Sequence, residues 1–213
     1  MSHRGLTPAP CGSCFYSTLC RQIYALLRSH QQSSEHLLFG QRTTTIFAPN
    51  GSGKTPLIQA VAFCLGFPVT FRQDINDKCQ AAVLTVEINS EQLSFRRHIG
   101  KDFHVEVRAA NGSVRDFFSE NDFSKAVFQS LNISLPILVS SSKQATNPYL
   151  ATVLPLFYLD QDSGYAEYYK PIKSFISDQF VEMIRFCFGL GPKHSFQAKS
   201  DLIKAKERAI RVV

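Results

Sequence analysis

The apolar positions in the first third of the chain predict short strands followed by a helix. Two apolar runs, residues 23–27 and 36–39, are separated by a polar turn, and a third run, residues 43–47, is β-branched. A break rich in proline, asparagine and glycine follows. From Lys54 onward apolar side chains cover most of a helix surface, so this helix is expected to be buried and to end at Gly66. A strand, a loop and a buried helix in this order indicate an α/β core.

The middle of the chain changes to a period of two, which is typical of half-buried strands. Turn residues at 89–91 and at Asn111-Gly112 separate or follow these strands. The pattern therefore predicts an antiparallel β region of about three strands. Its alternating positions are Leu84, Val86 and Ile88, then Leu93, Phe95, Arg97 and Ile99, then Phe103, Val105 and Val107.

Two further helices are predicted after these strands, because apolar residues return to helical spacing. A polar stretch, residues 140–149, is expected to form a surface loop between them. The sequence Gly-Leu-Gly-Pro at 189–192 ends the second helix. The apolar faces of the two helices are Phe123, Ala126, Val127 and Leu131, and Phe180, Met183, Ile184, Cys187 and Phe188.

The C-terminal residues 193–213 combine apolar positions at spacings of 3, 4 and 3 with a series of basic residues. This spacing predicts the start of a coiled-coil helix. A solvated amphipathic helix at the end of a globular domain is the alternative. Residues 1–20 are expected to be a flexible N-terminus, which leaves residues 21–192 as the main lobe.

The composition, 44% hydrophobic and 19% charged, is that of an ordinary globular protein. The chain has no run of 18 apolar residues, and its N-terminus lacks the apolar core of a signal peptide. We therefore expect a cytoplasmic protein without a membrane partner. The net charge of +6 favours polyanionic partners in general, or serves solubility alone.

The cysteines leave one question open. Cys11 and Cys14 form a C-x-x-C pair that could begin a zinc site, but a fourth ligand at a recognised spacing is missing, so their role is undetermined. Cys64, Cys79 and Cys187 lie in apolar or mixed surroundings. We expect them to be small core residues in a reducing compartment.

The glycine-rich break, "APNGSGKT" at residues 48–55, fits the phosphate-binding P-loop pattern G-x-x-x-x-G-K-[ST] with alanine at the first position. Gly51 and Gly53 permit backbone conformations in which successive N–H groups turn toward one phosphate. Lys54 would reach the β- and γ-phosphates, and the Thr55 hydroxyl would be a magnesium ligand. The following helix directs its positive end at the same anion. These features predict a nucleotide site, with a purely structural loop as the alternative.

Pro56 departs from what a phosphate loop needs. It occupies a place where a backbone N–H ordinarily faces the α-phosphate, and proline has no N–H. Proline is nevertheless tolerated in the first turn of a helix. We expect binding to survive with a weaker hold on the α-phosphate.

The inner sequence P-N-G-S-G-K-T resembles the loop of ABC-type ATPase heads in the SMC and SbcC-type family. The order of elements is also similar, since a buried helix ending in "LG" and a sheet carrying "FRRHI" follow the loop. The resemblance spans about residues 21–213. It implies an α/β fold, namely an ABC-type P-loop half-head with an antiparallel β subregion and the start of a coiled-coil helix.

The resemblance also implies roles for individual residues. Asn50 would lie beside the γ-phosphate, and Gln161, in "FYLDQDSGY", would touch magnesium and the attacking water. Arg72 is a weaker candidate for an arginine directed at the nucleotide. The implied catalytic residues are Lys54 and Gln161, and Thr55 and Gln161 would hold Mg²⁺. The implied ATP-binding residues are Asn50, Gly51, Ser52, Gly53, Lys54, Thr55, Pro56 and Arg72.

An alternative interpretation makes "LPLFYLD" a Walker B strand in which Asp160 holds magnesium through water. Two observations argue against it. Pro155 would interrupt a central strand, and Gln161 stands where an ABC head would place the catalytic glutamate.

Two parts of a complete ABC head are missing from the sequence. No L-S-G-G-Q-like signature follows the loop, and no second apolar run ends in Asp-Glu. The resemblance therefore implies an N-terminal half, completed by a C-terminal half-head or a second subunit, in a head that dimerises around ATP. Such a head would hydrolyse ATP in DNA repair, chromosome maintenance or defence against foreign DNA, whereas the isolated chain is expected to bind ATP without turnover.

Two rival functions remain at this point. A small P-loop kinase would be complete at this length but would not need the antiparallel insertion. A nucleotide-gated interaction module would bind ATP and never hydrolyse it. Direct DNA binding through phosphates is the least supported expectation. It rests on the basic residues Lys193, Lys199, Lys204, Lys206, Arg208 and Arg211, with Arg96 and Arg97 as a second basic pair that either faces DNA or solvates a strand edge.

Overall fold

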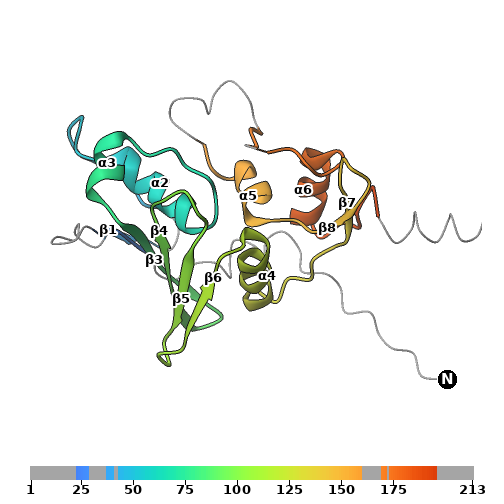
Figure 1. The fold of residues 1–213 in the computed structure, drawn as a ribbon, viewed down its shortest axis with the longest axis horizontal. Helices are drawn as coiled ribbons and strands as arrows, with labels where there is room; N and C mark the ends of the chain where they lie inside the picture. The colour runs from blue at the N-terminus through green and yellow to red at the C-terminus, as the bar shows by residue number, and fades with distance from the viewer. Residues whose placement is uncertain (1–22, 29–36, 41–42, 160–168, 172, 196–213) are drawn as a thin grey trace, which may run out of the picture.

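The computed structural model describes residues 23–28, 37–40, 43–159, 169–171 and 173–195 (Figure 1). A six-stranded sheet runs through its N-terminal part in the order β2-β1-β3-β4-β5-β6, and every neighbouring pair is antiparallel. The strands are β1 (Ile23–Arg28), β2 (Leu37–Phe39), β3 (Ala81–Ile88), β4 (Glu91–His98), β5 (Val105–Ala109) and β6 (Val114–Phe117).

The strands β3 and β4 show why the period of two was informative. Leu84 and Val86 on β3 and Phe95 on β4 are buried on one face, and the residues between them are less buried. The two-residue turn between the strands places Asn89 and Ser90 at positive φ, as a type I′ hairpin requires. The predicted antiparallel region is therefore present, with one face toward the core and one toward solvent.

The antiparallel region is larger than predicted. It includes a fourth strand, β6, after the turn at Asn111-Gly112, and it joins β1 and β2 in a single sheet. Gly112 has a φ of +83°, a value that glycine adopts at low cost in a tight turn.

The prediction of a strand at residues 43–47 is wrong. This run is not a strand, and none of the described strands pairs with it. The Phe47 side chain is 98% exposed. β-branched residues favour a strand only where a neighbouring strand offers a ladder and side-chain contacts. Here β1 already pairs with β2 on one side and β3 on the other.

The helices other than α4 fall into two groups in Figure 1. The helix α2 packs on β1, β3 and β4, and α3 follows it in the chain. The helices α5 and α6 lie near the small antiparallel pair β7-β8. The bounds are α2 (Lys54–Cys64), α3 (Gln73–Lys78), α4 (Glu120–Ser130), β7 (Leu138–Val139), β8 (Ala145–Thr146), α5 (Leu150–Val153) and α6 (Gln179–Cys187).

The core centres on aromatic contacts between α4 and the sheet. Phe123 is fully buried, and its ring lies 5.6 Å from that of Phe95 and 5.8 Å from that of Phe117. Ser119 caps α4 by accepting a hydrogen bond from the Asp122 N–H. The two later helices were thus predicted in the right places, on their apolar spacing.

The sequence around Pro155 is helical. Leu150–Val153 forms α5, and a 3₁₀ helix, Leu154–Leu156, continues it with Pro155 in its first turn. Proline removes a ladder donor, so the residue suits this turn and not a central strand. The alternative of a Walker B strand through these residues is therefore wrong. Asp160 and Gln161 lie outside the described residues.

Candidate phosphate-binding site

The loop before α2 has the backbone conformation that its glycines predicted. Gly51 and Gly53 have φ values of +81° and +85°, in the left-handed region, with Ser52 between them. A turn closes where the Ser52 N–H donates to the carbonyl of Pro49 at 3.3 Å. A Cβ at either glycine would meet no atom within 4 Å, so the requirement for glycine is conformational and not one of space. Such a backbone turns its N–H groups toward a common point.

The N-terminus of α2 continues this concave surface. Gly53 is the N-cap residue and provides no side chain to the helix end, and the first turn contains no acidic residue. The first bond within the helix runs from the Leu57 N–H to the Gly53 carbonyl at 3.2 Å. Helix geometry gives the N–H groups of a first turn no acceptor within the helix itself, and the helix dipole adds positive potential there. This end of α2 suits an anion such as phosphate.

Lys54 lies over the loop. Its ammonium group donates to the carbonyls of Ala48 at 2.5 Å and Pro49 at 2.7 Å. An ammonium group has three N–H donors, so a third remains beyond these two bonds. The ammonium group of Lys54 therefore lies beside the loop in the absence of a ligand.

The other predicted site residues are distributed around this loop. Asn50 and Ser52 are exposed on it, and Pro56 is buried in the first turn of α2, which runs through it without a break. Arg72 does not contact the loop through any hydrogen bond of the described residues. It forms an ion pair with Asp74 at 2.6 Å, which holds the pKa of Asp74 below its usual range. Gln161 lies outside the described residues.

The structure corrects the interpretation of Arg97. Its side chain is buried, and its guanidinium donates to the carbonyls of Phe63 and Phe67 at the end of α2. Arg97 therefore cannot face DNA or solvate a strand edge. Arg97 continues the alternation of Leu93 and Phe95 on the apolar face of β4. Successive residues of a strand point to opposite faces, so Arg96 lies on the other face.

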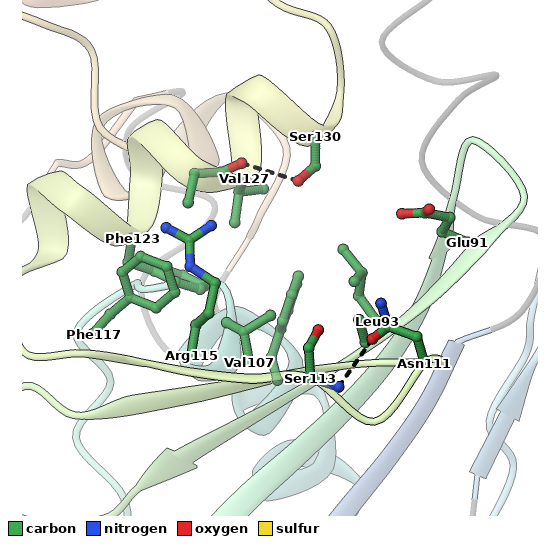
Figure 2. Close-up of a pocket in the computed structure, with 13 residues that line it drawn as sticks. Glu91, Leu93, Val107, Asn111, Ser113, Arg115, Phe117, Phe123, Val127 and Ser130 are labelled. Carbon is green, nitrogen blue, oxygen red and sulfur yellow. Dashed lines mark hydrogen bonds between the residues drawn. The ribbon is translucent and has the colours of Figure 1, made fainter.

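A cavity of about 240 Å³ lies elsewhere, between α4 and the strands β4, β5 and β6 (Figure 2). Figure 2 shows side chains of the sheet and of α4 facing each other across a largely apolar space. Polar groups at its edge bond locally: the Ser113 N–H donates to the Asn111 side chain, and the Ser130 hydroxyl donates to the Ala126 carbonyl. None of the residues lining the cavity belongs to the glycine loop.

Other types of site find no support in the described part of the chain. It contains no group of three or more histidine, cysteine or acidic side chains arranged to hold a metal ion. Cys11 and Cys14 lie outside the described residues. Burial raises the pKa of the Cys64 thiol to about 12, as expected of an unreactive core residue. Within the same residues, no helix combines the length and the apolar character that a membrane crossing needs.

A family model described as an AAA domain matches residues 27–209 of the chain. This range contains the glycine loop, the sheet from β3 to β6 and the helix α6. No curated protein and no solved structure matches the chain.

Proposed function

The chain belongs to the AAA domain family, a P-loop family found in SMC- and SbcC-like ATPases, and from this premise we propose that it is the ATP-binding N-terminal half of an SMC/SbcC-like head. Members of the family generally bind ATP with Mg²⁺. The observation that carries the proposal is the glycine loop. Two left-handed glycines lead into an uncapped helix N-terminus beneath a lysine ammonium group.

Several residues in and around the loop have a role in this proposal. Backbone N–H groups around Gly51 and Gly53 bind the phosphates, Lys54 leaves the loop carbonyls for the β- and γ-phosphates, and Thr55 binds Mg²⁺. Asn50 lies beside the γ-phosphate. Gln161 orients the attacking water. Arg72, which pairs with Asp74, is the weaker candidate for a contact with the nucleotide. Hydrolysis needs two things in addition to this positioning. A base must activate the water, and positively charged or hydrogen-bonding groups must stabilise the charge that develops in the transition state.

The exposed segment before the loop supports a proposal about the partner. Residues 43–47 are β-branched and apolar, and they have no partner strand among the described residues. The Phe47 side chain lies almost wholly in solvent. We propose that a C-terminal half-head, or a second subunit that carries the signature motif and the Asp-Glu pair, supplies a strand beside residues 43–47 and covers Phe47. The completed heads then dimerise around two ATP molecules.

The cellular role belongs to the same proposal. We place the protein in the cytoplasm, in DNA repair, chromosome maintenance or defence against foreign DNA. Support for DNA comes from the resemblance and from the net charge of +6. Of the basic residues near the C-terminus, Lys193 is described, and it pairs with Asp178 at 2.7 Å.

An assay of phosphate release tests whether this chain binds ATP but needs a C-terminal half to hydrolyse it. The chain alone is expected to turn over ATP at well below about 1 s⁻¹, the lower range of ordinary enzymes. Adding a C-terminal half with the signature motif should raise the rate, and duplex DNA should raise it further. The same mixture with Lys54→Ala is the control. Turnover near 1 s⁻¹ by the chain alone, lost in Lys54→Ala, would show a complete site and contradict the half-head.

Replacement of Pro56 by alanine is expected to tighten ATP binding by about tenfold or more. Alanine restores the N–H that proline lacks, and a hydrogen bond to a charged group contributes about 1.5–3 kcal/mol, where 1.4 kcal/mol is a factor of about ten. Calorimetry with Mg²⁺-ATP measures the change. The exposed Pro68 provides a matched control, Pro68→Ala, which should bind as wild type. Equal affinity of Pro56→Ala and wild type would mean that the missing N–H does not limit binding.

A further inference from the structure

The C-terminal end of α2, opposite the phosphate loop, is held by one buried arginine. Arg97 of β4 is 8% exposed, and its Nη1 atom donates to the carbonyl oxygens of Phe63 at 2.6 Å and Phe67 at 3.0 Å. The guanidinium carbon lies 4.0 Å from the ring centroid of Phe63 and 4.8 Å from that of Phe103. Two carbonyls and two aromatic faces thus fix the group in position.

The arginine keeps its charge in this environment. Burial lowers its pKa to about 10, so the group remains protonated at neutral pH. Its electrostatic neighbours among the described residues are the Cys64 thiol and the Glu120 carboxyl, whose own pKa is raised by burial. The groups that accept its hydrogen bonds belong to the last turn of α2 and the residues after it, where the helix dipole is negative. The end of α2 therefore acts as the counter-charge.

The burial of this charge is not in itself evidence of added stability. Moving an ion out of water costs free energy that an apolar side chain does not cost, although removing Arg97 alone would take a donor from the carbonyls of Phe63 and Phe67. Leu93 and Phe95 show that the same face of β4 accepts apolar side chains. The arginine adds hydrogen bonds, which are directional. The apolar contacts of α2 with the sheet are not directional, whereas the two hydrogen bonds fix how far α2 lies along its axis relative to β4.

The opposite end of the same helix carries the loop. The helix α2 runs without interruption from Lys54 to Cys64, and a Schellman motif at Gly66 closes it, with bonds from the N–H groups of Gly66 and Phe67. A shift of its C-terminal end must therefore move the N-terminal turn as well. We propose that Arg97 is a positioning residue that holds the loop at residues 48–55 in its phosphate-binding place through α2. This inference rests on the proposed function of the loop.

Two variants of the full chain test the proposal by calorimetry with Mg²⁺-ATP. Arg97→Met nearly keeps the side-chain volume and removes the charge and both hydrogen bonds. It should weaken ATP binding by about five- to 150-fold, a range typical of coupling between separate sites. Arg97→Lys should lie between this variant and wild type. Met183→Ala is the control, because Met183 is also buried but lies in α6. It should lower the melting temperature without changing ATP affinity.

A pH series separates positioning by charge from a merely structural role. A lysine buried at position 97 should have a lowered pKa and lose its proton as pH rises. The ATP affinity of Arg97→Lys should therefore fall as the pH rises through the lowered pKa of this lysine, whereas that of wild type stays level. Folded Arg97→Met with wild-type affinity would overturn the proposal, as would parallel pH profiles for Arg97→Lys and wild type. Wild-type protein that binds no ATP would instead refute the proposed function.

Discussion

ATP affinity should fall by about an order of magnitude or more when Lys54 is replaced by alanine. The ammonium group would contribute charge-assisted hydrogen bonds to the β- and γ-phosphates, each worth about 1.5–3 kcal/mol. Part of that energy is already used in the ligand-free loop, where Lys54 bonds to the carbonyls of Ala48 and Pro49. Calorimetric titration with Mg²⁺-ATP measures the difference.

The control for this variant is Lys78→Ala. Lys78 is an exposed lysine in the last turn of α3, so its removal changes the net charge equally without touching the loop. Equal ATP affinity for Lys54→Ala and wild type would end the interpretation of residues 48–55 as a nucleotide site. A loss shared by both variants would indicate a general effect of charge.

A lower melting temperature is the expected result of Glu182→Ala. The carboxylate is 1% exposed, and its two oxygens accept hydrogen bonds from the backbone N–H groups of Lys193 at 3.2 Å and His194 at 2.7 Å. Alanine would leave both donors without their acceptor, at a cost of about 3 kcal/mol or more. For a chain of this size the melting temperature should fall by roughly 6–12 °C, measured by calorimetry or circular dichroism.

Two further variants make this result specific. Glu182→Gln keeps one carbonyl oxygen as an acceptor and should be destabilised less. Asp178→Asn removes the exposed ion pairs with Lys193 and His194, and exposed pairs contribute at most about 1 kcal/mol. If Glu182→Ala melted like wild type, the buried carboxylate would not anchor the segment after α6.

The elements that could be predicted are those whose structure follows from a local sequence pattern, such as a period of two, helical spacing or paired glycines. The period of two at Leu84, Val86 and Phe95 identified the hairpin of β3 and β4, because one face of each strand had to be buried. The glycine loop was also readable, since Gly51 and Gly53 occupy conformations that other residues rarely adopt. The spacing of apolar residues located α4 and α6, because one face of each helix had to be buried.

The elements that were missed depend on partners that local sequence does not specify. Residues 43–47 have the composition of a strand, but composition does not supply a neighbour. The edge strand β6 buries Phe117 and exposes the three residues before it, so no alternation marks it. Arg97 looked like a surface residue because arginine usually is one, and only the approach of α2 to β4 gives it buried acceptors.

The order of the strands has a consequence for how the chain folds. The strands β3, β4, β5 and β6 follow one another both in the chain and in the sheet, so their pairings join residues that are close in sequence. Pairings of this kind cost little loop-closure entropy and form quickly. The pairing of β1 with β3 differs, because Tyr24 lies opposite Thr85 and the whole glycine loop and α2 are contained in the connection. The meander can therefore form from local contacts, whereas the phosphate loop reaches its place only through the longest-range contact of the sheet.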